Sequence, residues 1–143
     1  MSTANDFKEL KIWQKARMLN REIYRICSSP LFSKDFGLRD QLRRASVSVS
    51  SNIAEGFERE GNKEFIQFLY IAKGSLAEIQ SQLYLAFDVE YLSENEFEKM
   101  NNQIAELMRM IKSFINYLKQ SDLKGNKYLR EPEELYGQGL SEN

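Results

Sequence analysis

Residues 41–56 read Gln-Leu-Arg-Arg-Ala-Ser-Val-Ser-Val-Ser-Ser-Asn-Ile-Ala-Glu-Gly, and this stretch decides the fold. Six residues in and before this stretch recur at alternating spacings of four and three, which places them on one face of a helix. They are Leu38, Leu42, Ala45, Val49, Asn52 and Gly56. A strand competes locally, because Ser46 to Ser50 alternate with a period of two. That alternation is short and lies inside the longer helical pattern. We therefore expect a helix from about Lys34 to Glu58.

The core-facing side chains of this helix are small, which lets a neighbouring helix approach closely. Gly56 and Gly74 are expected to serve such close approach, because no glycine pattern typical of a phosphate loop is present. Gly61-Asn62 supplies the break after the helix and a candidate N-cap for the next one.

A first helix is expected from about Phe7 to Ser28. Asp6 and Glu9 have the spacing of a capping box, in which each side chain satisfies an otherwise unpaired backbone N–H. The segment ends before Pro30, because proline disfavours helix in the residue that precedes it.

A third helix, from about Lys63 to Tyr91, has two apolar stripes. The first stripe begins at Phe65 and ends at Ala86, and it is sufficient to bury one side of an amphipathic helix. The second stripe predicts burial on a further side, because leaving it in water would create an apolar patch. Its candidate oligomer-interface residues are Ile66, Tyr70, Tyr84, Phe87 and Tyr91. The alternative is a wide core face from which the tyrosine hydroxyls reach solvent.

A fourth helix is expected from the capping box of Ser93 and Glu96 to about Gln120. Residues 121–143 lose the helical period, are acidic near residues 131–134, and are expected to form a flexible tail. The chain thus divides into a bundle of residues 1–120 and a tail of residues 121–143.

Four long helices with short connections predict an all-α, antiparallel up-down-up-down four-helix bundle. No apolar run approaches the roughly 20 residues that span a bilayer, so no membrane partner is expected. Cys27 is the single cysteine and the N-terminus resembles no signal peptide, which indicates a reducing, cytoplasmic location.

The chain contains no histidine. This absence removes nucleophile activation by histidine and the commonest transition-metal ligand. We therefore expect no enzyme activity, no metal and no cofactor, although catalysis by carboxylates alone stays open.

Charge is unevenly distributed along the chain. Residues 1–63 carry an excess of four Lys and Arg, whereas residues 64–143 carry an excess of five Asp and Glu. Arg43 and Arg44 are the leading candidates for phosphate contacts, because guanidinium groups stay charged and can grip phosphates through paired hydrogen bonds. Other candidates for this basic surface are Lys11, Lys15, Arg39, Arg59 and Lys63. The alternative is that either arginine pairs with an acid of another helix or subunit.

A structural polar network is expected from Asn52, Glu55, Ser75 and Glu78, which can face one another across the second and third helices. Buried carboxylates need hydrogen bonds or charged partners. The network is interpreted as fixing the register of the helices. An acid/base or metal-binding pair of Glu55 and Glu78 is the competing interpretation.

Several motifs together resemble a known family. They are Leu10-x-Ile12-Trp13-Gln14-x-Ala16, Gln41 to Ala45, Asn52 to Gly56, and Ala72 to Glu78. Over residues 7–120 the chain resembles the four-helix bundle proteins encoded within intervening sequences of bacterial 23S ribosomal RNA genes. That family is similar in fold to the accessory variability proteins of diversity-generating retroelements.

The resemblance implies a ring-shaped homo-oligomer, a pentamer, and binding of RNA or DNA. The leading hypothesis is accordingly an oligomeric, non-enzymatic helical scaffold that binds nucleic acid through a basic surface. The runner-up is a protein-protein interaction module without a nucleic-acid role.

Overall fold

The computed structural model describes residues 6–123 and Tyr136. These residues form helices joined by short connections and contain no strand, which confirms the all-α class. The elements in chain order are the 3-10 helix η1 (Phe7–Glu9), α1 (Lys11–Cys27), the 3-10 helix η2 (Phe32–Lys34), α2 (Phe36–Phe57), α3 (Asn62–Asp88) and α4 (Glu94–Leu123).

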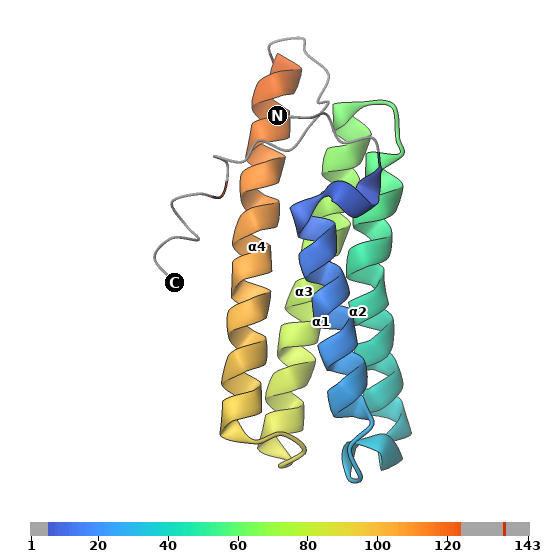
Figure 1. Cartoon of the computed structure of the whole chain (residues 1–143), viewed down its shortest axis with the longest axis vertical. Helices are drawn as coiled ribbons and strands as arrows, with labels where there is room; N and C mark the ends of the chain where they lie inside the picture. Colours follow the sequence, from blue (N-terminus) through green and yellow to red (C-terminus); the bar gives the residue numbers. More distant parts are fainter. Residues whose placement is uncertain (1–5, 124–135, 137–143) are drawn as a thin grey trace.

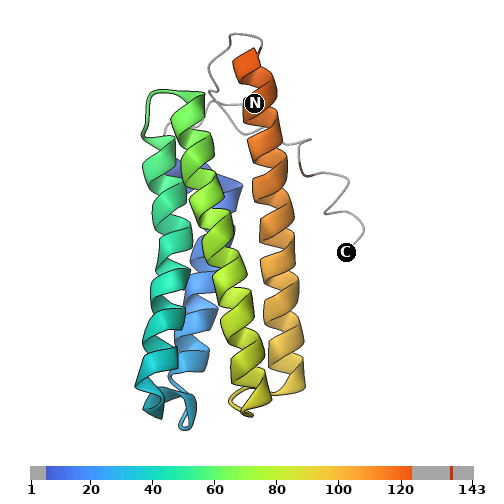
Figure 2. The same cartoon turned by 180° about the vertical axis from the view of Figure 1, so that it is seen from behind.

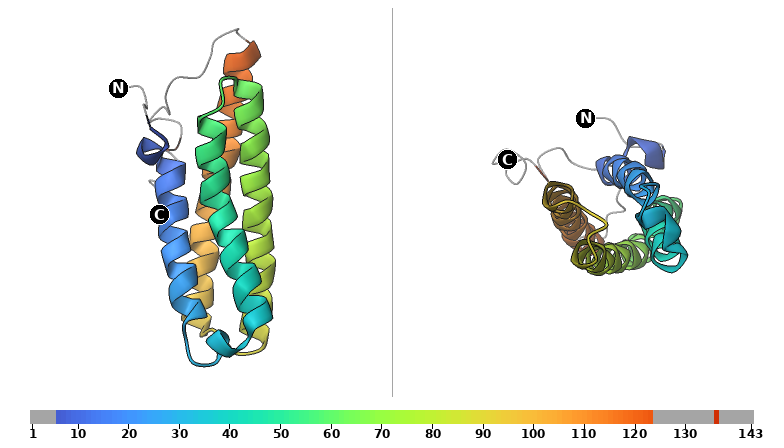
Figure 3. Two further views of the ribbon diagram at one scale, coloured as in Figure 1. Left: turned by 90° about the vertical axis from the view of Figure 1, so that its right-hand side faces the viewer. Right: turned by 90° about the horizontal axis from the view of Figure 1, so that it is seen from below.

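The four α-helices run alternately down and up along one long axis (Figure 1 and Figure 2). Seen from one end, they follow one another around the bundle in chain order (Figure 3). Each helix contacts its neighbours in sequence, and α1 also contacts α4, which closes the bundle. The α2–α3 contact is the most extensive and the α1–α4 contact is the least extensive of these four.

The predicted start of the first helix is wrong. Asp6 accepts a hydrogen bond from the Lys8 backbone, but it caps the short helix η1, and α1 begins after an extended Leu10. Successive helical residues are rotated by about 100°, so a continuous helix would turn Leu10 well away from the core side of Ile12. The break at Leu10 allows both side chains to be fully buried.

The second and fourth helices each begin after a residue whose side-chain oxygen accepts a hydrogen bond from a backbone N–H of the first turn. The Asp35 carboxylate accepts from the Leu38 backbone N–H at 3.2 Å, so α2 begins at Phe36, slightly later than predicted. The capping box before α4 is confirmed, because the Glu96 N–H donates to Ser93 Oγ at 3.1 Å. Side chains of this kind satisfy N–H groups that have no partner inside the helix.

The third helix ends earlier than predicted, and the fourth helix ends later. α3 ends at Asp88 rather than Tyr91, because Glu90 adopts a left-handed φ of 66° that stops the helix. α4 continues to Leu123, three residues beyond Gln120. The predicted tail of residues 121–143 otherwise lies outside the described residues, with the exception of Tyr136, which is 4% exposed and belongs to the core.

Gly56 fulfils its predicted role in close packing. A Cβ atom there would lie 2.7 Å from Phe68 Cβ and 2.9 Å from Phe65 Cδ1, closer than carbon atoms can approach without displacement. Gly74 permits no close approach within the subunit, because a Cβ atom there would meet no atom within 4 Å. Gly74 faces outward from α3 and serves no contact of its own subunit.

The first stripe of α3, from Phe65 to Ala86, is buried in the core as predicted. Of the stripe expected for α2, Leu42, Ala45, Val49 and Gly56 are buried. The Ser46–Ser50 segment is helical, so the longer period prevailed over the local alternation. Within the described part of the chain, every helix is too short or too polar to cross a membrane.

Candidate nucleic-acid interface

The seven predicted basic residues do not form one surface. Arg39 lies in the first turn of α2, whereas Arg59 follows the other end of that helix. The exposed residues Lys11 and Lys63 lie at the starts of α1 and α3. Since α2 rises by about 1.5 Å per residue, its two ends are roughly 30 Å apart.

Lys15, Arg39 and Arg59 are held by acids of the same chain. Lys15 Nζ lies 3.0 Å from Glu106 of α4, and Arg39 Nε lies 3.0 Å from Asp40. Arg59 pairs with Glu55 at 3.0 Å. These pairs are part of the folded subunit and reduce the charge available to a phosphate.

Arg43 and Arg44 point to different sides of α2. The Arg43 guanidinium carbon lies 4.9 Å from the ring centroid of Tyr24 on α1, within the range of a cation–π interaction. Arg44 is exposed and lines a shallow depression on the α3 side together with Ser75 and Glu78. Neighbouring positions on a helix are rotated by about 100°, so the two arginines cannot grip one phosphate together from the same side.

Three exposed residues of α1 on the side that meets Arg43 were not among the predicted site residues, namely Arg17, Arg21 and Tyr24. Arg17 and Arg21 are exposed one turn apart on α1, and the Arg17 guanidinium carbon lies 5.7 Å from the ring centroid of Trp13. Trp13 and Tyr24 are eleven residues apart, so they lie on nearly the same side of α1. We name this the α1–α2 face, and its residues are Trp13, Arg17, Arg21, Tyr24 and Arg43. These residues could have been identified from the sequence, because arginines recur at intervals of one helical turn between two aromatic residues.

The cations of the α1–α2 face are free of acids. Among the described residues, Arg17, Arg21 and Arg43 have no ion pair. The nearby Asp40 pairs with Arg39, and Glu22 accepts from Arg25 at 2.9 Å. The charge of this face is therefore available to an anionic ligand.

Arg43 also lies beside the buried Cys27 thiol. Burial raises the pKa of Cys27 to about 11, and the positive charge of Arg43 opposes this rise. The thiol therefore stays protonated at neutral pH and presents no nucleophile at this site.

The relative positions of α1 and α2 depend on a polar cluster that sequence reasoning also missed. Asn20 of α1 donates through Nδ2 to Ser50 Oγ at 2.9 Å, and its Oδ1 accepts from Ser46 Oγ. Ser46 is fully buried and Ser50 is 9% exposed. These bonds hold one edge of α1 against α2, which aligns Tyr24 with Arg43.

The predicted polar network is present in part. Asn52 Nδ2 donates to Ser48 Oγ at 3.0 Å, and Ser75 Oγ donates to the same hydroxyl at 2.9 Å, which joins α2 to α3. Glu55 and Glu78 are exposed and do not join this chain of bonds. Glu78 instead accepts from Gln82 Nε2 at 3.3 Å.

The predicted oligomer-interface residues divide into two groups. Phe87 stacks on Phe97 of α4 at 4.6 Å, and Tyr91 donates to the Asp35 carboxylate at 2.9 Å, so both have partners within the subunit. Ile66 also packs against the core. Tyr70 and Tyr84 also contact α4, because Lys119 Nζ donates to the Tyr70 hydroxyl at 2.7 Å and the Tyr84 ring meets Phe97 at 4.9 Å. They nevertheless remain 46% and 51% exposed.

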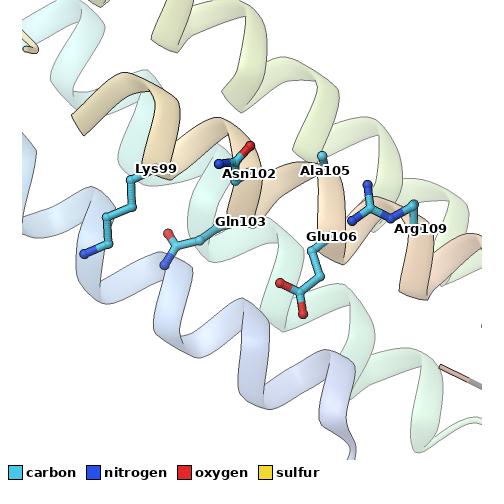
Figure 4. Close-up of a pocket in the computed structure, with 6 residues that line it drawn as sticks. All are labelled: Lys99, Asn102, Gln103, Ala105, Glu106 and Arg109. Atoms are coloured by element: carbon cyan, nitrogen blue, oxygen red, sulfur yellow. The ribbon is translucent and has the colours of Figure 1, made fainter. Parts of the chain in front are cut away.

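A polar depression lies on α4 where it faces α1. Lys99, Gln103 and Glu106 reach toward α1, and Glu106 is the partner of Lys15 (Figure 4). Within the described residues, no group of three His, Cys, Asp or Glu side chains could hold a metal ion. The depression offers polar side chains of both charges and carries no specific chemistry.

The fold and this surface define a class: a histidine-free, antiparallel four-helix bundle whose candidate site is an exposed cationic face. The family model described as 23S rRNA-intervening sequence protein matches residues 8–113. The chain therefore belongs to the 23S rRNA-intervening sequence protein family.

A solved structure supports the same assignment. It is a protein with unknown function from the S23 ribosomal protein family of Bacteroides thetaiotaomicron, which is 25% identical to this chain with a TM-score of 0.67. The similarity covers 73% of this chain and 97% of that one. No curated protein matches the sequence significantly.

Proposed function

We propose that this protein is a non-enzymatic helical scaffold that binds nucleic acid, RNA or DNA, through the α1–α2 face. The observation that carries the proposal is a group of three guanidinium groups, on Arg17, Arg21 and Arg43, that form no ion pair with any residue the structure describes. Guanidinium groups suit phosphate recognition because their planar donors match phosphate oxygens in pairs. The net charge of −1 means that affinity has to come from this local cluster.

The three cations lie close enough to contact one backbone. Arg17 and Arg21 are one helical turn apart, and Arg43 is fixed against Tyr24 on the same side. Contacts of this kind neutralise phosphates and release counterions, so binding weakens as salt increases. They position the ligand and supply little sequence selectivity.

The test is fluorescence anisotropy with labelled RNA and DNA at two salt concentrations. Replacing Arg17, Arg21 and Arg43 together with glutamine is expected to lower the salt slope of log affinity by about two, since each phosphate contact on a single strand contributes roughly 0.7. A matched control replaces Arg44, Lys63 and Arg109, three exposed cations of other faces, and should change the slope little. Equal losses in both variants, or no binding by the unmodified protein at low salt, would refute the proposal.

The second candidate function is protein docking on the outer face of α3, beginning with further copies of this chain. Gly74 stands at the centre of that face, although glycine inside a helix costs about 1 kcal/mol relative to alanine. No atom of its own subunit lies within 4 Å of a Cβ built there. The surrounding side chains are about half exposed, namely Tyr70, Ile71, Tyr84 and Leu85. A helix that packed lengthwise along this face would cover all four.

Light scattering at micromolar concentration tests this second function. The unmodified chain is expected to be a homo-oligomer, as a ring would require, and Gly74→Leu is expected to reduce its mass toward that of a monomer. Lys112→Leu, at an exposed position of α4, serves as the control for added apolar surface. A monomeric unmodified protein would remove self-association from the proposal and leave docking of a different protein to be sought by affinity capture.

A further inference from the structure

Two guanidinium–aromatic stacks lie on the α1–α2 face. Arg17 lies 5.7 Å from the Trp13 ring centroid and Arg43 lies 4.9 Å from that of Tyr24. The two rings are eleven residues apart on α1, which corresponds to about 16 Å along the helix. The face therefore presents two flat, cationic stacking platforms rather than isolated charges.

Other arginines that stack on rings in this subunit are already committed to acids. Arg39 lies over Phe36 and Arg59 lies over Phe68, but each also forms an ion pair within the chain. Arg17 and Arg43 form none among the described residues. Within the part of the chain that the structure describes, a ring-stacked guanidinium group without an acid partner thus occurs only on the α1–α2 face, and the other such cation is the ammonium group of Lys119 over Tyr70.

The surroundings of each stack hold its plane in place. Trp13 is half-buried and meets Phe7 edge-on with ring centroids 5.1 Å apart. Arg43 is half-buried beside Cys27, and its Nε is buried without a hydrogen-bond partner among the described residues. Tyr24 remains 43% exposed. Packing therefore orders the Trp13 ring and the Arg43 guanidinium group before any ligand arrives, whereas Arg17 is exposed.

Flat cationic surfaces of this kind suit unpaired bases. Bases in single strands can stack on aromatic rings or on guanidinium planes, whereas bases inside a duplex are stacked on one another and unavailable. A face that used charge alone would favour a duplex, which has twice as many phosphates per length. Resting on the proposed function, we infer that the α1–α2 face binds single-stranded nucleic acid, with unpaired bases stacking at the two platforms and Arg21 contacting the backbone.

The experiment compares a fluorescently labelled single strand with its duplex of equal length, as RNA and as DNA. The unmodified protein is expected to bind the single strand about tenfold more tightly, which is the effect of one additional stacked base. Trp13 is the only tryptophan in the chain, so its intrinsic fluorescence reports on that platform directly. Quenching is expected with the single strand and not with the duplex.

Two variants separate stacking from charge. Arg43→Lys keeps the charge and removes the plane, while Tyr24→Leu keeps apolar bulk and removes the ring. Each is expected to weaken single-strand binding about tenfold and to change duplex binding less than twofold. Arg44→Lys is the matched control, because it makes the same exchange at the next residue on the α3 side of the helix. Circular dichroism verifies that each variant retains its helices.

The outcomes distinguish this inference from the proposal on which it rests. Equal or tighter binding of the duplex, or unchanged single-strand affinity in Arg43→Lys, would overturn single-strand recognition and leave nucleic-acid binding in place. Absence of binding to every probe at low salt would overturn both. Trp13 quenching by the single strand in the unmodified protein supports the inference even if a variant fails to fold.

Discussion

The α2–α3 contact and the α1–α4 contact are held together by different means. Between α2 and α3, Gly56 lets the helices approach so closely that an added Cβ would lie 2.7 Å from Phe68 Cβ. Between α1 and α4, ion pairs link Lys15 with Glu106 at 3.0 Å and Arg25 with Glu96 at 3.5 Å. One contact depends on shape and the other depends in part on solvent-accessible charge.

The difference indicates that substitutions are tolerated better at the α1–α4 contact than at the α2–α3 contact. A close-packed contact cannot absorb an added atom without moving backbone. Exposed ion pairs contribute little and are weakened by salt. The α2–α3 pair is thus the close-packed part of the bundle, and α1, which carries most of the candidate binding face, contacts α2 more extensively than α4.

The strongest way to break this comparison is to fill the α2–α3 contact. Gly56→Ala is expected to lower the free energy of unfolding by about 1–3 kcal/mol, the usual cost of overpacking a well-packed core. Urea denaturation followed by circular dichroism measures the change. A neutral result would mean that Phe65 and Phe68 can move aside and that the contact is not close-packed in solution.

A second prediction concerns the α1–α2 contact. Asn20→Ala leaves the buried hydroxyls of Ser46 and Ser50 without their amide partner and is expected to cost about 1–2 kcal/mol. Because the bonds align Tyr24 with Arg43, nucleic-acid affinity should fall as well. The double variant Asn20→Ala/Ser46→Ala, measured by the same denaturation, should lose less than the sum of the single variants, whereas strict additivity would show that the bond carries no coupling.

Gly74→Ala sharpens the contrast with Gly56, because the same substitution should have the opposite sign. The added Cβ meets no atom within 4 Å, so a monomeric subunit is expected to gain up to about 1 kcal/mol from better helix propensity. Denaturation at low protein concentration isolates this gain. If the outer face of α3 mediates self-association, light scattering will show weaker assembly at the same time.

The smallest effect is expected at the α1–α4 contact. A double-mutant cycle of Lys15→Ala and Glu106→Ala should give a coupling energy of about 0.2–1 kcal/mol that shrinks as salt is added, since their side chains are 41% and 24% exposed. The cycle is measured by denaturation at low and high salt. A larger, salt-independent coupling would place this pair among the packed contacts and remove the contrast.

Much of the fold was predictable because the helical period extends over whole segments. The positions of Phe65, Leu69 and Leu76 on one stripe predicted their burial, and the capping box at Ser93 and Glu96 predicted the start of α4. The break at Leu10 was not predictable from local signals, because the capping residues before it favoured a continuous helix. Burial of Leu10 in the tertiary fold decided that position.

The candidate site was predictable only in its chemistry. The chemistry of the guanidinium group identified Arg43 as a candidate, but the neighbouring sequence did not indicate that Arg44 would face α3. The loss of Lys15 and Arg59 to ion pairs depends on acids that only folding brings within reach. Conversely, Arg17 and Tyr24 became part of the candidate site because α1 packs beside Arg43.

The amino-acid sequence by itself determined the number of long helices, their apolar stripes and the absence of histidine chemistry, because these follow from local spacing and residue type. The tertiary structure decided which glycine is packed, which cations are neutralised and which rings meet a guanidinium group. Those properties depend on distances between residues of different helices, and the spacing of residues along one helix does not determine those distances.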